Sequence, residues 1–133
     1  GLTEWLAAEF SEAERGNAAV SGLSADPDGD GLVNLAEYTL NTSPKATDAA
    51  PLEVVEVAEG NASYLSVSFT RRQGAAVSVG LEGSADLYQW ATINGVEESV
   101  QALGDGVERV TLRDSQARSG NVSRYVRLRM DAN

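Results

Sequence analysis

Residues 65–70 read LSVSFT, and their strict alternation of apolar and polar side chains predicts a β-strand with one buried face. The same alternation recurs at 77–81 (VSVGL) and at 126–130 (VRLRM). About seven short strands, separated by turn-forming Gly and Asn residues, predict an antiparallel β-sandwich of immunoglobulin-like or jelly-roll type. The other predicted strands cover 52–58, 89–93, 96–103 and 107–113.

The pattern before residue 51 is different. Apolar side chains at helical spacing predict short helices over 3–15 and 32–40, and Asn41 suits the left-handed cap that ends the second one. We therefore expect a mainly β fold with a short N-terminal α part. The predicted parts are 1–50, which holds the helices, and 51–133, which holds the sandwich, with 41–50 as the connection.

The composition excludes several kinds of chemistry. The 133 residues include 20 acidic and 10 basic side chains, a net charge of −10, and neither Cys nor His. Disulfides, thiol nucleophiles, imidazole-based triads and Cys/His zinc sites are therefore excluded, and we expect no enzyme. The negative charge disfavours nucleic acid, and the absence of an apolar run of about 20 residues predicts no membrane insertion.

Residues 26–37 read DPDGDGLVNLAE and have the spacing of a calcium loop. Acidic side chains occupy positions 1, 3 and 5, Gly31 allows the turn at position 6, and an amide and a carboxylate follow at positions 9 and 12. Val33 is expected to point into the core. With oxygen as the ligand atom, calcium is the predicted cofactor. The predicted ligands are Asp26, Asp28, Asp30, the main-chain carbonyl of Leu32, Asn34 and Glu37.

An alternative interpretation of the same segment is a metal-free turn, because Asp, Gly and Pro are common in solvated turns. Glu37 at position 12 and a helix that begins inside the loop favour the metal site, since an ordinary turn requires neither.

The loop resembles those of EF-hands, dockerins and thrombospondin type 3 repeats. Together with WLAAEF near the start, YLSVSFTRR, LEGSADLYQW and RYVRLRM, the sequence is similar to a C-terminal module of large secreted or surface proteins of environmental bacteria. Asn41 stands where that family usually has Gly. The resemblance implies a single calcium-binding helix–loop–helix followed by a small β-sandwich.

These observations predict a non-catalytic calcium-binding module of a larger extracellular protein, secreted or at the cell surface. Calcium would act structurally, and the partners would be other domains of the parent chain. One alternative is a carbohydrate-binding module that targets a parent glycoside-active enzyme to polysaccharide. Another is a secretion or surface-anchoring module.

Two aromatic residues could contact a glycan. Alternation would place Tyr88 and Trp90 on one face of a strand, where exposed rings could stack on sugars. The favoured interpretation is that Trp90, like Trp5, packs in the core or against the N-terminal helices.

The last candidate binding residues are arginines. Those at 71, 72, 124, 127 and 129 could bind an anionic polysaccharide. The favoured interpretation is a solvated sheet face, in which they pair with acidic residues such as Glu108 and Asp114.

Overall fold

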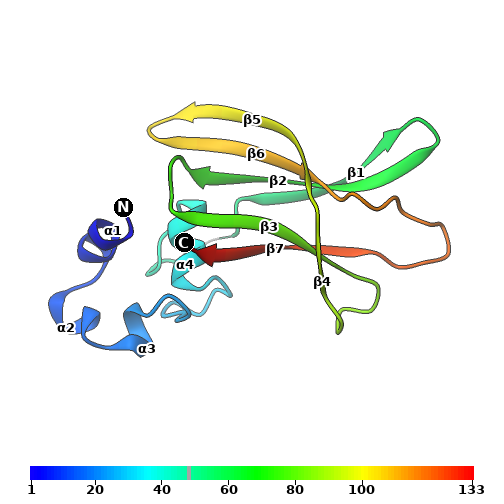
Figure 1. Ribbon diagram of the computed structural model, residues 1–133. Helices are drawn as coiled ribbons and strands as arrows, with labels where there is room; N and C mark the ends of the chain where they lie inside the picture. The colour runs from blue at the N-terminus through cyan, green and yellow to red at the C-terminus, as the bar shows by residue number, and fades with distance from the viewer. Residues whose placement is uncertain (48) are drawn as a thin grey trace.

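The computed structural model of the protein describes residues 1–47 and 49–133. The predicted connection at 41–50 contains residue 48, which lies outside the described residues. Within the described residues the fold is mainly β, with a short N-terminal helical part at one end of two antiparallel sheets (Figure 1). No helix in this part of the chain has the length and apolar character needed to cross a membrane.

The helical part contains α1 (Leu2–Glu9), α2 (Glu12–Arg15), α3 (Ala18–Ser21) and α4 (Asn34–Leu40). The prediction of one continuous helix over 3–15 is wrong, because the chain becomes extended at Phe10 and a new helix begins after Ser11. Ser11 Oγ accepts a hydrogen bond from the backbone N–H of Glu14. The Glu14 carboxylate in turn accepts one from the backbone N–H of Ser11. This capping box stabilises the start of α2.

The second predicted helix is confirmed as α4, and Asn41 ends it with φ 63° and ψ 46°. Asparagine tolerates this left-handed conformation better than most residues with a side chain.

Seven strands form the rest of the described structure. The four-stranded sheet has the order β1-β2-β6-β5, and the three-stranded sheet has the order β4-β3-β7. The predicted strand at 89–93 begins later than expected, at Ala91, because a turn occupies the residues before it. The strands are β1 (Leu52–Glu59), β2 (Ala62–Arg72), β3 (Val77–Ser84), β4 (Ala91–Ile93), β5 (Val96–Gly104), β6 (Val107–Arg113) and β7 (Tyr125–Ala132).

Both sheets contribute to one hydrophobic core. Its buried side chains alternate along the strands with polar ones, as the period of two predicts. The buried members are Leu40, Val67, Phe69, Leu81, Val110 and Leu112, and the half-buried ones packed against them include Val79, Ile93, Val126, Leu128 and Met130.

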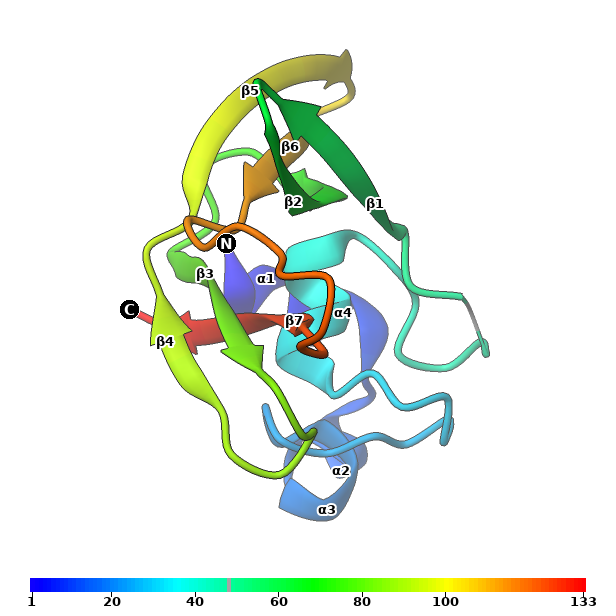
Figure 2. The same ribbon diagram turned by 90° about the vertical axis from the view of Figure 1, so that its right-hand side faces the viewer.

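Helix α4 joins the helical part to the sheets. It packs against β2 and β7, with β7 in front of it in the turned view (Figure 2), and Leu40 enters the core shared by the sheets. Tyr38 packs instead on Trp5 and Phe10, with ring centroids 5.5 Å apart for the Tyr38–Trp5 pair. The prediction that Trp5 packs in the core or against the N-terminal helices is confirmed, since it joins this cluster and only 7% of it is exposed.

A buried ion pair fixes the connection between β6 and β7. Asp114 is fully buried, and its Oδ2 accepts from Arg124 Nε at 2.7 Å. Gly83 leaves the space that this guanidinium occupies, since a Cβ there would lie 2.6 Å from Arg124 Nη2. The predicted pairing of Asp114 with an arginine is confirmed, but the pair is buried, so the prediction that Arg124 lies on a solvated sheet face is wrong.

Candidate metal centre

The loop before α4 brings three carboxylates together. Asp26, Asp28 and Asp30 each offer an oxygen, and these oxygens lie within 4.8 Å of one another. The backbone curls tightly around them, with φ 70° at Gly29 and 92° at Gly31, values that favour glycine. Three of the ligands expected from the sequence are thus adjacent.

Backbone N–H groups hold all three carboxylates in place, and Asp28 Oδ1 accepts from Asp30 at 3.3 Å. Asp26 accepts from Gly29 at 3.0 Å and from Gly31 at 2.9 Å, and Asp30 accepts from Leu32 at 2.9 Å. The loop therefore orients the acidic side chains through its own backbone.

The carboxylate of Asp28 is only partly compensated. Its Oδ2 is buried, with no hydrogen-bond partner within the described residues. Desolvation raises the pKa of Asp28 above its ordinary value of 3.8, and the neighbouring side chains of Asp26 and Asp30 raise it further. A cation between these oxygens would supply the missing positive charge. The residues present therefore fit a metal ion bound through oxygen.

Asn34 is fully buried and fastens the loop to the preceding segment. Its Nδ2 donates to the carbonyls of Val20 and Gly22, both at 2.9 Å. Its Oδ1 is buried and accepts no hydrogen bond within the part of the chain that the structure describes. The sequence interpretation gave Asn34 a role as ligand only and missed this anchoring role, for which the sequence carries no local signal.

Glu37 lies in α4, as predicted, and is fully buried. Its Oε2 accepts from the hydroxyl of Thr42, a residue that the sequence interpretation did not assign to the site. The cluster of mutually close carboxylates comprises the three aspartates. Coordination by Asn34, by Glu37 and by the carbonyl of Leu32 remains a prediction.

The expectation that Val33 points into the core is wrong. Val33 is 37% exposed, is the N-cap residue of α4, and lines an apolar groove. Leu32 lines the same groove and packs against the shared core. The helix cap turns Val33 outwards, so Leu32 makes the apolar contact instead.

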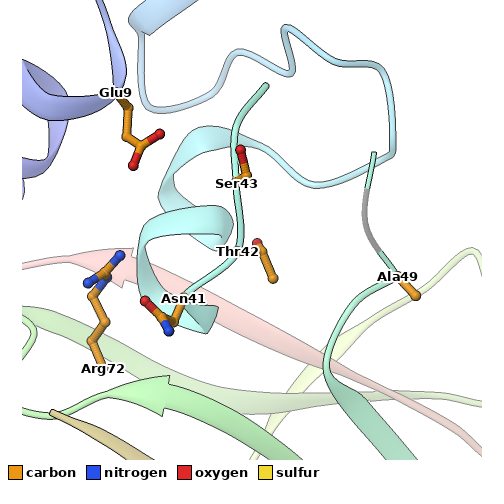
Figure 3. Close-up of a pocket in the computed structure, with 6 residues that line it drawn as sticks. All are labelled: Glu9, Asn41, Thr42, Ser43, Ala49 and Arg72. Atoms are coloured by element: carbon orange, nitrogen blue, oxygen red, sulfur yellow. The ribbon is translucent and has the colours of Figure 1, made fainter. Parts of the chain in front are cut away.

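A second hollow lies beside the end of α4 (Figure 3). Glu9, Asn41, Thr42, Ser43, Ala49 and Arg72 line it. The Nε of Arg72 donates to the carbonyl of Tyr38 at 2.7 Å, so its guanidinium attaches α4 to β2. Arg71, one residue earlier, pairs with Glu108 at 2.9 Å across the sheet, which confirms the predicted pairing.

The aromatic pair is placed differently from either sequence interpretation. Tyr88 and Trp90 precede β4 and do not share a strand. Tyr88 is 88% exposed. Trp90 is half-buried, and neither hydrophobic cluster of the described residues includes it. The prediction that Trp90 packs in the core or against the helices is wrong, because its ring lies over the Arg127 guanidinium at 4.1 Å.

Fold and site together define a mainly β protein with an acidic loop that could hold a metal ion. Comparison with models of known families, with curated proteins and with solved structures gives no match. What the chain does must therefore be inferred from its own side chains and their arrangement.

Proposed function

We propose that this chain is a non-catalytic module of a larger secreted or cell-surface protein, in which Ca²⁺ acts structurally. The observation that carries the proposal is the convergence of three aspartate oxygens within 4.8 Å on the loop that leads into α4. Its partners are the other domains of the parent protein, as its resemblance to C-terminal modules of surface proteins implies.

The ion would act by relieving repulsion at the entrance to α4. Without a cation, three carboxylates crowd one another, and ionised Asp28 is destabilised because one of its oxygens is buried without a donor. Calcium is favoured over magnesium because a flexible loop with many oxygens suits the larger ion. Leu40 at the other end of α4 enters the core, so an ordered loop would hold the helical part on the sheets.

The proposed fold type is an immunoglobulin-like sandwich. The order β1-β2-β6-β5 corresponds to strands A-B-E-D of that fold, and β4-β3-β7 corresponds to C′-C-F. The same order supports the resemblance to a calcium-loop module followed by a small β-sandwich.

A calcium titration of chelated protein tests the proposal. We expect the melting temperature to rise with added Ca²⁺, and to rise less with Mg²⁺ at equal concentration. At one hundred times the dissociation constant, calcium should add about 2.7 kcal/mol to the free energy of unfolding.

Matched variants locate the effect. Asp28→Asn should abolish the calcium-dependent stabilisation, while Glu53→Gln, a change on exposed β1, should leave it intact. An unchanged melting temperature on adding calcium to the wild-type protein would refute a structural calcium site.

A further inference from the structure

The outer face of the three-stranded sheet carries a row of polar side chains beside Trp90. On β7 the side chains of Val126, Leu128 and Met130 face the core, so those of Arg127 and Arg129 face outwards. The strand register aligns three outward residues across the sheet, in the order Thr92, Glu82 and Arg127.

These polar groups are already held in place. Arg127 Nε donates to Glu82 at 3.0 Å, while Arg129 donates from Nε to Asp131 at 2.8 Å and from Nη1 to Thr92 at 3.2 Å. The two arginines are about half exposed, at 51% and 49% of their side-chain surface. The face therefore offers the two arginines and the Thr92 hydroxyl in fixed, exposed positions, with the Glu82 carboxylate between them 18% exposed.

The loop before β4, which carries the two aromatic residues, has a backbone fixed by hydrogen bonds. Ser84 Oγ accepts from the backbone of Asp86 and Leu87, and Asp86 Oδ1 accepts from that of Tyr88 and Gln89. Leu87 adopts φ 68°, an unusual conformation for leucine that such a network can maintain.

The indole of Trp90 is fixed from two sides. Its Nε1 donates to the Leu87 carbonyl at 3.2 Å, and the Arg127 guanidinium covers the ring. Because Trp90 is only half-buried, part of this oriented ring stays exposed.

A notch in the same face lies next to these groups. Gly80 is paired with Arg129, so a side chain there would also point outwards, yet nothing lies within 4 Å of the position its Cβ would occupy. The row of side chains on β3 is therefore interrupted beside Glu82. An elongated ligand could approach the sheet backbone at this point.

We propose that this face, from Tyr88 and Trp90 across Glu82 and Arg127 to the notch at Gly80, binds a polysaccharide chain. The C–H face of a sugar ring stacks on exposed aromatic surface, and its hydroxyl groups need both donors and acceptors, which the Arg–Glu–Thr row supplies. This binding role is independent of the calcium loop and goes beyond a structural module.

The charges of the face favour polysaccharide over the other stacking ligand, a single-stranded nucleic acid. Nucleic acid binding combines aromatic stacking with a groove of uncompensated positive charge. Here Glu82 and Asp131 neutralise the two arginines, and the chain carries a net charge of −10.

Binding to insoluble and soluble polysaccharides tests the proposal on the intact chain, in chelator and again in calcium. The probes are cellulose, xylan and chitin as neutral chains and alginate as an anionic one, with single-stranded DNA as the competing ligand. We expect at least one polysaccharide to bind in both conditions. Trp90→Ala should weaken that binding at least tenfold.

Gly80→Val is the sharpest variant, because its Cβ would have no atom within 4 Å and valine suits a strand, so it should fill the notch with little strain. It should keep the melting temperature and lose binding at least fivefold, whereas Gln101→Val, on exposed β5 of the other sheet, should bind as the wild type does. No binding to any polysaccharide, binding unaffected by Trp90→Ala and Gly80→Val, or preference for DNA would each overturn the proposal. Loss of the calcium effect alone would leave it standing.

Discussion

The helical part and the sheets differ in what they bury. In the described part of the chain, the helices bury four polar side chains, Ser21, Asn34, Glu37 and Thr39, beside the apolar Trp5, Tyr38 and Leu40. The strands and their connections bury mainly Val, Leu and Phe. Buried polar groups stabilise a fold only while their partners remain in place, whereas apolar packing does not depend on protonation or ions. The helical part should therefore respond to ions and pH more than the sheets do.

Phe69→Ala should have the largest effect on stability. Phe69 is fully buried in the core to which both sheets contribute. We expect the free energy of unfolding to fall by about 3–5 kcal/mol, as for other buried aromatic residues. Urea unfolding measures it. Val55→Ala, on β1 and 40% exposed, should change it by less than about 0.5 kcal/mol.

Asp114→Asn tests the buried ion pair between Asp114 and Arg124, a polar contact in the mainly apolar interior of the sheet part. Removing one charge of a buried pair leaves the other uncompensated, so we expect a loss of about 3 kcal/mol. The exposed pair Glu53–Arg109 provides the control, since Glu53→Gln should cost under about 1 kcal/mol. Equal losses in the two variants, again by urea unfolding, would contradict this assignment.

Ser11→Ala removes the side-chain cap of α2. We expect a loss of about 1 kcal/mol that is confined to the helical part. Amide hydrogen exchange should therefore accelerate in residues 12–21 and remain unchanged in β2 and β6. Acceleration throughout the strands would show that the two parts unfold as one unit.

The smallest expected effect is the loss of the stability contributed by Glu14 at acidic pH. Lys45, followed by the backbone N–H of Ser11, lowers the pKa of Glu14 from 4.5 to about 2. A carboxyl with a lowered folded-state pKa contributes stability that is complete above 4.5 and is lost as the pH falls towards about 2. The stability difference between the wild type and Glu14→Gln should therefore shrink over this range. Urea midpoints at about pH 6 and about pH 3 measure it, and a constant difference would refute the assignment.

The sheets were the more predictable region. Strands β2, β3 and β7 follow from alternation, because successive side chains of a strand face opposite sides and only one side is buried. The loop was predictable for a similar reason, since the spacing of Asp26, Asp28 and Asp30 brings alternate side chains together. The division into two sheets, β1-β2-β6-β5 and β4-β3-β7, could not be predicted in this way. It depends on pairing between residues that are distant in the sequence.

The errors have physical causes. The helix break at Ser11 carried a signal, Ser followed three residues later by Glu, that was overlooked. The sequence around Trp90 carried no signal for its position. The orientation of this ring depends on Arg127, which is 37 residues away in the sequence and adjacent only in the folded sheet.

The contact between Gly83 and Arg124 limits the order in which this sequence can change. A side chain at position 83 would collide with the Arg124 guanidinium. Shortening Arg124 first would leave the buried Asp114 carboxylate without its positive partner. The three positions therefore constrain one another, and substitutions harmless in combination are harmful one at a time. Chains descended from a common ancestor should keep glycine at 83 wherever they keep the buried pair, and exchange all three together or not at all.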